Sequence, residues 1–174
     1  MLLFQEEARF GRISEGRRRC WAPYPERPHA ARQVVRQYLF MRPWPLSPLE
    51  GRLCALILPW MNAQTMGLFL RHTAKHFAPD RSILFLDQAG WHVAEHLHVP
   101  RGMKLVFLPA RSPELNPTES LWKHIRENYF GQGPLDSLQD VKERLCTAFR
   151  ALDQQPEVIK SLCGYRWLKT ISLT

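Results

Sequence analysis

The sequence has few cysteines and no long apolar run, and both shortages narrow the class of protein. Its cysteines form no C-x-x-C pair, which excludes a zinc ribbon and a thioredoxin-type redox motif. The longest apolar runs, such as residues 53–61, are too short to cross a bilayer. No signal peptide is recognisable, and unpaired thiols suit a reducing compartment. We therefore expect a cytoplasmic protein that makes no contact with a membrane.

Acidic residues are also scarce beside basic ones. Lysine and arginine total 24 against 16 aspartates and glutamates, which gives a net charge of +8. A basic surface attracts polyanions, of which nucleic acid is the commonest, although such a charge also serves solubility alone. The run Arg17, Arg18 and Arg19 offers guanidinium forks that suit phosphate oxygens, or forms a solvated turn. The run is therefore a candidate DNA-binding site, with a solvated turn as the alternative.

Residue patterns predict one α/β domain. Strands are expected at residues 1–4, 20–28, 34–41, 53–58, 82–86 and 104–108, and a loop at 42–51. Helices are expected from the cap Asn62 to about residue 77, from the cap Asn116 to residue 131, and over 137–152 with Asp136 and Gln139 as a capping box. Cys54 and Trp122 fall in apolar positions that favour the core. The order of the elements predicts a mixed sheet with helices packed on it.

Three acids fall at the ends or edges of predicted elements. Glu6 lies on the first strand, Asp87 closes the strand 82–86, and Glu119 lies in the first turn of the helix after Asn116-Pro117. Ligands of open α/β sheets bind at the carboxyl ends of strands. Carboxylates that converge there repel one another unless a cation lies between them, and oxygen ligands favour Mg²⁺ or Mn²⁺. Such ions can activate a water or a DNA 3′-hydroxyl.

Each acid also has a purely structural interpretation. Glu119 can complete a capping box with Asn116 and favour the helix dipole. Asp87 can cap the turn that follows it. Glu6 and Glu7 point to opposite faces if both lie on a strand, so one of them faces solvent or a partner. Spacing alone does not choose between these interpretations and a metal site.

Histidines and cations near the acids are further candidates. His92 follows Asp87 closely and can touch a substrate phosphate or assist proton transfer, or simply form part of a polar helix face. The pairs His92–His96 and His72–His76 have helical zinc-ligand spacing but lack a third ligand. Lys123 and Arg126, on the helix that carries Glu119, can contact the DNA backbone or form an exposed helix face.

Three segments resemble the motifs of a known family, both in their residues and in their order along the chain. The first is Phe4-Gln5-Glu6-Glu7-Ala8-Arg9-Phe10-Gly11, and the second is Leu84-Phe85-Leu86-Asp87-Gln88-Ala89-Gly90-Trp91-His92. The third, and the most specific, is Ser112-Pro113-Glu114-Leu115-Asn116-Pro117-Thr118-Glu119. Together they resemble the three acid-bearing segments of IS630 family transposases of the IS630/Tc1/mariner superfamily, which have a DDE endonuclease domain.

The resemblance implies a ribonuclease-H-like α/β fold with a mixed sheet flanked by helices. It implies Mg²⁺-dependent or Mn²⁺-dependent cleavage of phosphodiester bonds at transposon ends and strand transfer into target DNA. Glu6, Asp87 and Glu119 would be the catalytic, metal-binding triad, with Asn116 and Pro117 setting the angle of the third acid. The catalytic domain would cover residues 1–174, with 153–174 as a C-terminal extension. A homo-oligomer on DNA and a place at the bacterial nucleoid are also implied.

Two departures from the family pattern limit what is expected of this copy. Glu6 stands where the family has aspartate, and its extra methylene displaces the carboxylate, so we expect impaired cleavage. We expect the helix-turn-helix region of such transposases to be missing from this chain and to be supplied by an upstream transposase fragment. The alternatives are a non-catalytic DNA-binding remnant of a transposase, or another nuclease of the ribonuclease H fold.

Overall fold

The structure is a computed structural model that describes residues 1–13, 22–26, 34–41, 45–54, 62–88, 97–130 and 134–171. Predictions for Arg17, Arg18, Arg19, His92 and His96 lie outside these residues, as does most of the predicted strand 53–58. Of the predicted strand 20–28, the described residues 22–26 contain a turn and no strand, so the prediction was wrong for that part. No helix in the described part of the chain is long and apolar enough to cross a membrane.

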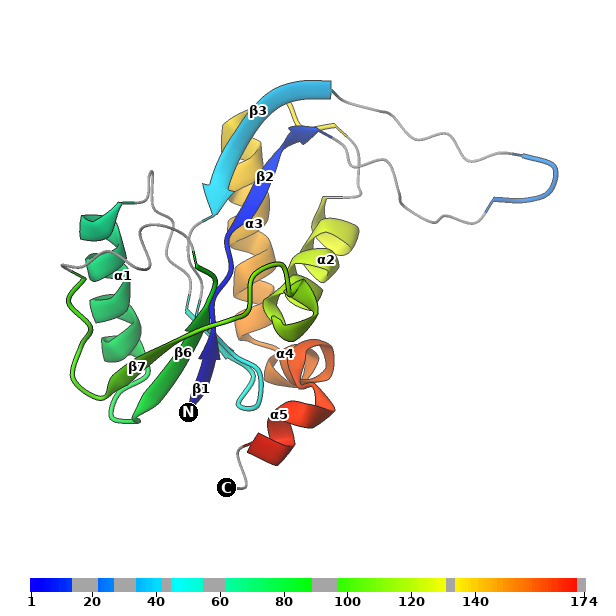
Figure 1. Ribbon diagram of the computed structural model, residues 1–174. Helices are drawn as coiled ribbons and strands as arrows, with labels where there is room; N and C mark the ends of the chain where they lie inside the picture. The colour runs from blue at the N-terminus through cyan, green and yellow to red at the C-terminus, as the bar shows by residue number, and fades with distance from the viewer. Residues whose placement is uncertain are drawn as a thin grey trace.

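A five-stranded mixed sheet forms the centre of the domain (Figure 1). Its order is β5 (Arg52–Leu53), β4 (Leu46–Ser47), β1 (Leu2–Phe4), β6 (Ser82–Leu86) and β7 (Met103–Phe107). β1, β6 and β7 run parallel, and β4 and β5 pair antiparallel to their neighbours. The predicted mixed α/β architecture is confirmed. The predicted loop 42–51 was wrong at β4, and the last predicted strand begins one residue earlier, at Met103.

A two-stranded ribbon continues the chain beyond this sheet. β2 (Ala8–Ile13) pairs antiparallel with β3 (Val34–Met41), whose bounds match the prediction. β2 itself was not predicted, because glycine and two arginines obscure its alternation of buried and exposed residues. The ribbon stands above β1 and β6 in Figure 1. The short segment 5–7 therefore joins two sheets, and the first acid of the sequence lies within it.

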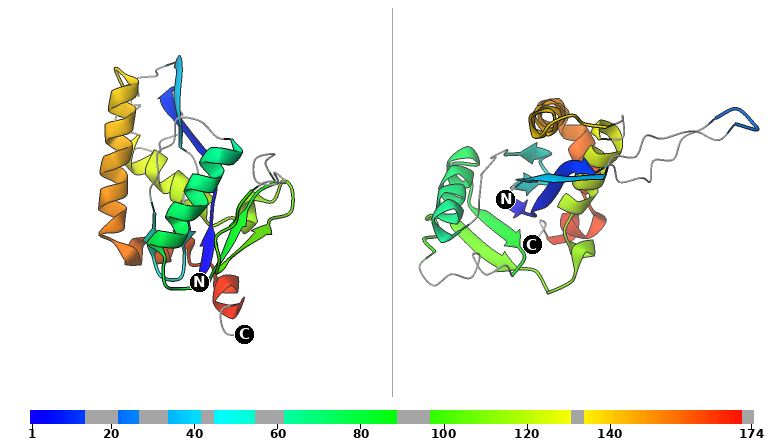
Figure 2. Two further views of the ribbon diagram at one scale, coloured as in Figure 1. Left: turned by 90° about the vertical axis from the view of Figure 1, so that its left-hand side faces the viewer. Right: turned by 90° about the horizontal axis from the view of Figure 1, so that it is seen from above.

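Helices cover both faces of the central sheet (Figure 2). α1 (Ala63–His76) packs on one face, where Leu3, Met66, Phe69, Leu84 and Leu86 form one core cluster. α2 (Thr118–Tyr129), α3 (Leu138–Asp153) and α4 (Pro156–Cys163) pack around a second cluster with the ribbon. A short 3₁₀ turn, Pro113–Leu115, precedes α2, and α5 (Arg166–Ile171) ends the described chain.

Local capping explains where the helices begin. The Asn62 side chain accepts from Thr65 N–H at 2.9 Å in a capping box, so the prediction for α1 is confirmed. The predicted cap of α2 was wrong: Pro117 is the N-cap, and the helix ends at Tyr129. The predicted capping box of α3 was displaced by one residue, since Ser137 and Asp140 form it. In both cases the capping residue lies one position along the chain from the predicted one.

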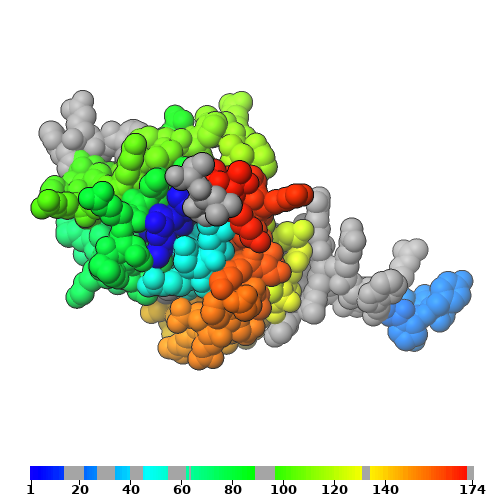
Figure 3. All heavy atoms as spheres, turned by 90° about the horizontal axis from the view of Figure 1, so that it is seen from below, coloured from blue at the N-terminus to red at the C-terminus, as the bar shows by residue number. Residues whose placement is uncertain are grey.

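The C-terminal helices belong to the same core as the rest of the domain. Ile159 and Cys163 are fully buried in the cluster that holds Trp122, itself 1% exposed as predicted. The Ser120 hydroxyl lies 2.8 Å from the Tyr165 hydroxyl, which links α2 to the segment before α5. Seen from below, α5 borders the amino-terminal residues and the segment that holds β4 and β5 (Figure 3). Residues 156–171 thus fold against the sheet.

Candidate functional site

Glu6 lies where β1 separates from β6. Gln5 N–H donates to Phe85 O at 2.9 Å, which extends the β1–β6 pairing by one residue beyond Phe4. The prediction that Glu6 lies on the first strand was wrong, because the chain leaves the sheet here to enter β2. Its side chain is half-buried. A carboxylate at this position lies just beyond the end of the β1–β6 pairing.

Asp87 directly follows the central strand β6, as predicted. Its side chain is exposed. Both neighbours of Asp87 bond to Leu108, the residue after β7: Leu108 N–H donates to Leu86 O at 2.9 Å, and the Gln88 side-chain amide donates to Leu108 O at 3.1 Å. The carboxyl end of β6 is therefore held beside the carboxyl end of β7, which is where ligands bind in sheets of this kind.

Glu119 is the second residue of α2 and is half-buried. Its position in the first turn favours a negative charge, since the helix dipole is positive there. Pro117 at the N-cap makes no side-chain cap bond, so the capping-box interpretation of Glu119 and Asn116 is not what the structure shows. Instead the Glu119 N–H donates to the Asn116 carbonyl at 3.2 Å.

Asn116 connects the third acidic segment to the first. Its side chain is 1% exposed, and Nδ2 donates to Glu6 Oε2 at 2.5 Å and to Gln5 O at 3.0 Å. Its Oδ1 accepts from the Thr118 hydroxyl at 2.5 Å and from Thr118 N–H at 3.2 Å. One buried amide thus fixes Glu6 relative to the start of α2. We expected Asn116 to orient the third acid; its side chain bonds to the first acid, and its carbonyl accepts from the N–H of the third.

The three acids are close enough to repel one another. Burial is the largest of the effects that raise the pKa of Glu6 from its ordinary 4.5 to about 7, followed by repulsion from Glu119 and then from Asp87. The Glu7 backbone N–H and Asn116 oppose the shift by donating to the Glu6 carboxylate. The fold therefore brings acids from three separate segments of the sequence within range of electrostatic repulsion.

The carboxylates of Glu6, Asp87 and Glu119 are suitable ligands for a hard cation. Their side chains do not lie close enough together to coordinate a single ion. Among the described residues, no three His, Cys, Asp or Glu side chains stand close enough to hold a metal ion. Repulsion acts over a longer range than an Mg²⁺–oxygen bond of about 2.1 Å, so the two findings agree. Carboxylate oxygens are the ligands that Mg²⁺ and Mn²⁺ prefer.

The pair His72–His76 on α1 lies next to Cys54, a neighbour that the spacing of the histidines in the sequence did not predict. His72 Nδ1 lies 3.3 Å from the Cys54 sulfur, and His76 lies one turn further along the helix. Burial raises the pKa of the Cys54 thiol to about 11, so the sulfur stays protonated at neutral pH. With no third ligand grouped there among the described residues, the zinc alternative gains no support at this pair.

The cations of α2 differ in what surrounds them. Lys123 is exposed, whereas Arg126 is half-buried with its guanidinium 5.2 Å from the centre of the Phe10 ring. Part of Arg126 therefore packs on β2, and Lys123 alone of the two projects into solvent. Arg17, Arg18, Arg19 and His92 lie outside the described residues, and nothing in the structure bears on their predicted contacts.

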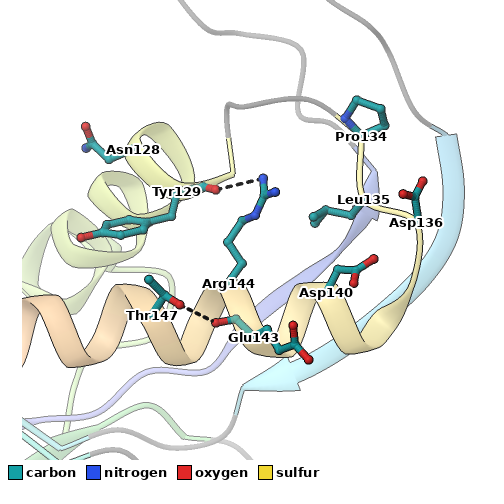
Figure 4. A pocket seen from close by; sticks show the side chains of 9 residues that line it. All are labelled: Asn128, Tyr129, Pro134, Leu135, Asp136, Asp140, Glu143, Arg144 and Thr147. Atoms are coloured by element: carbon teal, nitrogen blue, oxygen red, sulfur yellow. Dashed lines mark hydrogen bonds between the residues drawn. The ribbon is translucent and has the colours of Figure 1, made fainter.

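A pocket of about 600 Å³ lies away from the acids, between the end of α2 and the first half of α3 (Figure 4). Its lining includes Asp136, Asp140, Glu143 and Arg144, and none of the three candidate site acids. Arg144 Nη1 donates to Tyr129 O at 3.3 Å, and Asp140 caps α3. These polar groups hold the connection between the two helices, so the pocket has a structural explanation.

The fold and the acids together define a mixed α/β domain with carboxylates around the carboxyl end of its central strand. The chain belongs to the DDE superfamily endonucleases, whose family profile matches residues 2–142. It is also 36% identical over 121 residues to an uncharacterized protein, y4pE/y4sA, of Sinorhizobium fredii (strain NBRC 101917 / NGR234), and this match covers 69% of the chain and 90% of the relative.

Solved structures of the Mos1 transposase share the fold. The Mos1 mariner paired-end complex with Mn matches at a TM-score of 0.60 and 15% identity, and the paired-end complex with the left transposon end at 0.56 and 16%. Each match covers 94% of this chain but 53% and 56% of the Mos1 chain, so the chain spans about half of that protein's length. The predicted ribonuclease-H-like fold is confirmed.

Proposed function

We propose that this chain is the catalytic domain of a DNA transposase of the IS630 branch of the IS630/Tc1/mariner superfamily. In this proposal it cleaves phosphodiester bonds at transposon ends and transfers a strand into target DNA, with Mg²⁺ or Mn²⁺. Residues 1–174 form the catalytic domain, acting as a homo-oligomer on DNA beside an upstream helix-turn-helix fragment. The family, the Mos1-like fold and the three motif segments support the proposal.

The observation that carries it is the buried bond between Asn116 and Glu6. This bond brings the third motif segment onto the first, and repulsion from Glu119 and Asp87 adds to the burial that raises the pKa of Glu6. Structural roles such as capping a helix do not require acids from three separate segments to meet. A shared cation does, because it removes their mutual repulsion.

Each residue then has a defined role. Glu6, Asp87 and Glu119 would hold the cation, which when bound polarises the phosphodiester and makes a water or a 3′-hydroxyl more acidic. Asn116 holds the Glu6 carboxylate in place. Exposed Lys123, one turn beyond Glu119 on α2, contacts a phosphate of the bound DNA. Arg17, Arg18, Arg19 and Arg126 are proposed as further DNA contacts, and His92 as an auxiliary group.

Asp87→Ala tests this proposal in a nicking assay. Supercoiled plasmid that carries candidate element ends is incubated with Mn²⁺ or Mg²⁺ and either the wild-type chain, Asp87→Ala or Asp80→Ala. Asp80 is an exposed acid in the turn before β6, so its loss matches the change of charge without touching the site. We expect nicking that survives Asp80→Ala and disappears with Asp87→Ala.

A non-catalytic, DNA-binding remnant is the second candidate. One observation favours it: no three described carboxylates are grouped for a metal. The resemblance adds the expectation that Glu6 stands where the family has an aspartate. DNA binding without nicking, by the wild type and by Glu6→Asp alike, would support the remnant over the nuclease.

A further inference from the structure

The β2–β3 ribbon carries positive charge and no negative charge. Arg9, Arg12 and Arg36 lie on its two strands, and neither strand contains an aspartate or a glutamate. Alternation along the strands separates these arginines. Arg12 faces the helices, because its Nε donates to Leu135 O at 2.7 Å. Arg9 and Arg36 lie on the opposite face, which we call the outer face of the ribbon.

The inner face of the ribbon is filled by the core, and the outer face is not. Ala8 and Phe10 are buried in the cluster of α2 and α3, and Phe10 lies edge-on to Trp122 at 5.7 Å between ring centres. α3 lies along this side of the ribbon in Figure 2. On the outer face, Arg9 and Arg36 are exposed and Val34 is 62% exposed. Core formation therefore accounts for one face only.

Gly11 and Tyr38 hold Arg9 in a defined position on the outer face. A Cβ atom at Gly11 would lie 2.5 Å from Tyr38 Cδ1 and 2.3 Å from Gln37 O, so the ring packs directly on the glycine backbone. The Arg9 guanidinium lies 5.3 Å from the centre of the same ring, within the range of a cation–π contact. The Tyr38 ring, which packs against Gly11, therefore limits the positions that the Arg9 guanidinium can take on the outer face.

This face begins beside the acidic site. Arg9 follows Glu6 by three residues, a span of at most about 11 Å along an extended chain. That distance corresponds to roughly three nucleotides of a B-form strand, which rises about 3.4 Å per nucleotide. DNA bound with a phosphate at the acids therefore passes within reach of Arg9, and Arg36 lies further along the same face.

We propose that the outer face of the ribbon binds the DNA backbone next to the acidic site, with Arg9 and Arg36 on phosphates and Tyr38 positioning Arg9. The inference rests on the proposed function for the nature of the ligand. The absence of acids, two exposed arginines and an aromatic ring that orders one of them fit a polyanionic backbone. The contact reads no bases and is independent of DNA sequence.

Binding of a fluorescein-labelled 30-base-pair duplex, followed by anisotropy over a range of salt, tests the inference. The variant Arg9→Gln/Arg36→Gln is compared with Lys142→Gln/Arg150→Gln, which removes two exposed charges from α3 instead. We expect the ribbon variant to bind roughly tenfold more weakly or worse, and the slope of log K against log salt to fall by about two. The α3 variant should stay within about twofold of wild type.

Substitution of Tyr38 gives a second test, in which the net charge of the protein does not change. Tyr38→Phe keeps the ring and should bind as the wild type does, whereas Tyr38→Ala should weaken binding about threefold at unchanged charge. Equal affinities and salt slopes for the two double variants, or an unaffected Tyr38→Ala, overturn the inference. Circular dichroism of each variant confirms that the ribbon is folded.

The outcome is distinguishable from that of the proposed function. Asp87→Ala lies outside the ribbon and is scored by plasmid nicking, whereas the ribbon variants are scored by duplex affinity, so the two readouts are separate. If the ribbon variants lose DNA and no form of the chain nicks, the ribbon inference stands and the nuclease proposal fails. If the wild type nicks and the ribbon variants bind normally, the nuclease proposal stands and the ribbon inference fails.

Discussion

The Asn116 amide donates to the Glu6 carboxylate at 2.5 Å, across 110 positions of sequence. The bond joins the residue before the N-cap of α2 to the segment between β1 and β2. Because Asn116 is buried and also bonds Gln5 O and Thr118, it is a structural tie as well as part of the site. Its loss should therefore affect folding and chemistry together.

Asn116→Ala should lower the free energy of unfolding by about 1–3 kcal/mol, because it leaves the buried Gln5 carbonyl without this donor. Urea denaturation measures the change. Asn128→Ala is the control: Asn128 is exposed and bonds only within α2, to His124, so its loss should cost less than about 0.5 kcal/mol. An equal loss of unfolding free energy in the two variants would show that the hydrogen bonds of the Asn116 side chain do not stabilise the fold.

Glu6 should make stability depend on pH in a definite direction. Its pKa rises from 4.5 to about 7 on folding, so between these values the folded state holds more protons than the unfolded state. Stability is then lost as pH rises from about 4.5 through 7. Without metal, Glu6→Gln should melt above the wild type at pH 8, and this difference should shrink at pH 5. Glu127→Gln, at an exposed site on α2, should show no such pH-dependent difference.

Divalent cations should stabilise the chain if the acids bind them. Binding to the folded state at ten times Kd adds about 1.4 kcal/mol, seen as a rise in Tm with Mn²⁺ or Mg²⁺ and its reversal by EDTA. Asp87→Asn should abolish the rise, and Asp80→Asn should preserve it. If neither ion changes the Tm of the wild type, the result argues against the metal site. This test does not depend on any measurement of activity.

Glu6→Asp should increase nicking about tenfold if the extra methylene of Glu6 misplaces the carboxylate, since an error of about 1 Å can cost up to 10²-fold. Single-turnover nicking in Mn²⁺ measures the rate for both forms. The same change withdraws the carboxylate from Asn116, so the variant's stability is measured in parallel. An unchanged or slower rate in a stable variant would mean that Glu6 is not the defect.

Ile159→Ala tests whether residues 153–174 are an appended extension or part of the domain. Ile159 is fully buried beside Trp122 in the larger core cluster, so its truncation should cost about 2–5 kcal/mol. Glu157→Ala, which removes only the exposed ion pair with Lys160, should cost under about 1 kcal/mol. A small effect at Ile159 would support an independent extension.

Local signals in the sequence were enough for much of the fold. Asn62 and Thr65 are close neighbours whose capping chemistry fixes the start of α1. The run 82–86 forms its strand because it is apolar after Ser82, and Asp87 follows its end. The distinctive segment from Ser112 to Glu119 indicated a DDE endonuclease, and the family match confirms that superfamily. These features depend on residues a few positions apart, so the sequence by itself determined them.

Tertiary structure decided the rest, because it depends on contacts between residues far apart in the chain. The division of the first strand into β1 and β2 follows from pairing with two different partners, β6 and β3. The partner of Asn116, the contact of Cys54 with His72, and the burial of Ile159 likewise depend on which segments pack together. So does the pKa of Glu6, which is raised by burial and by acids that only folding brings near.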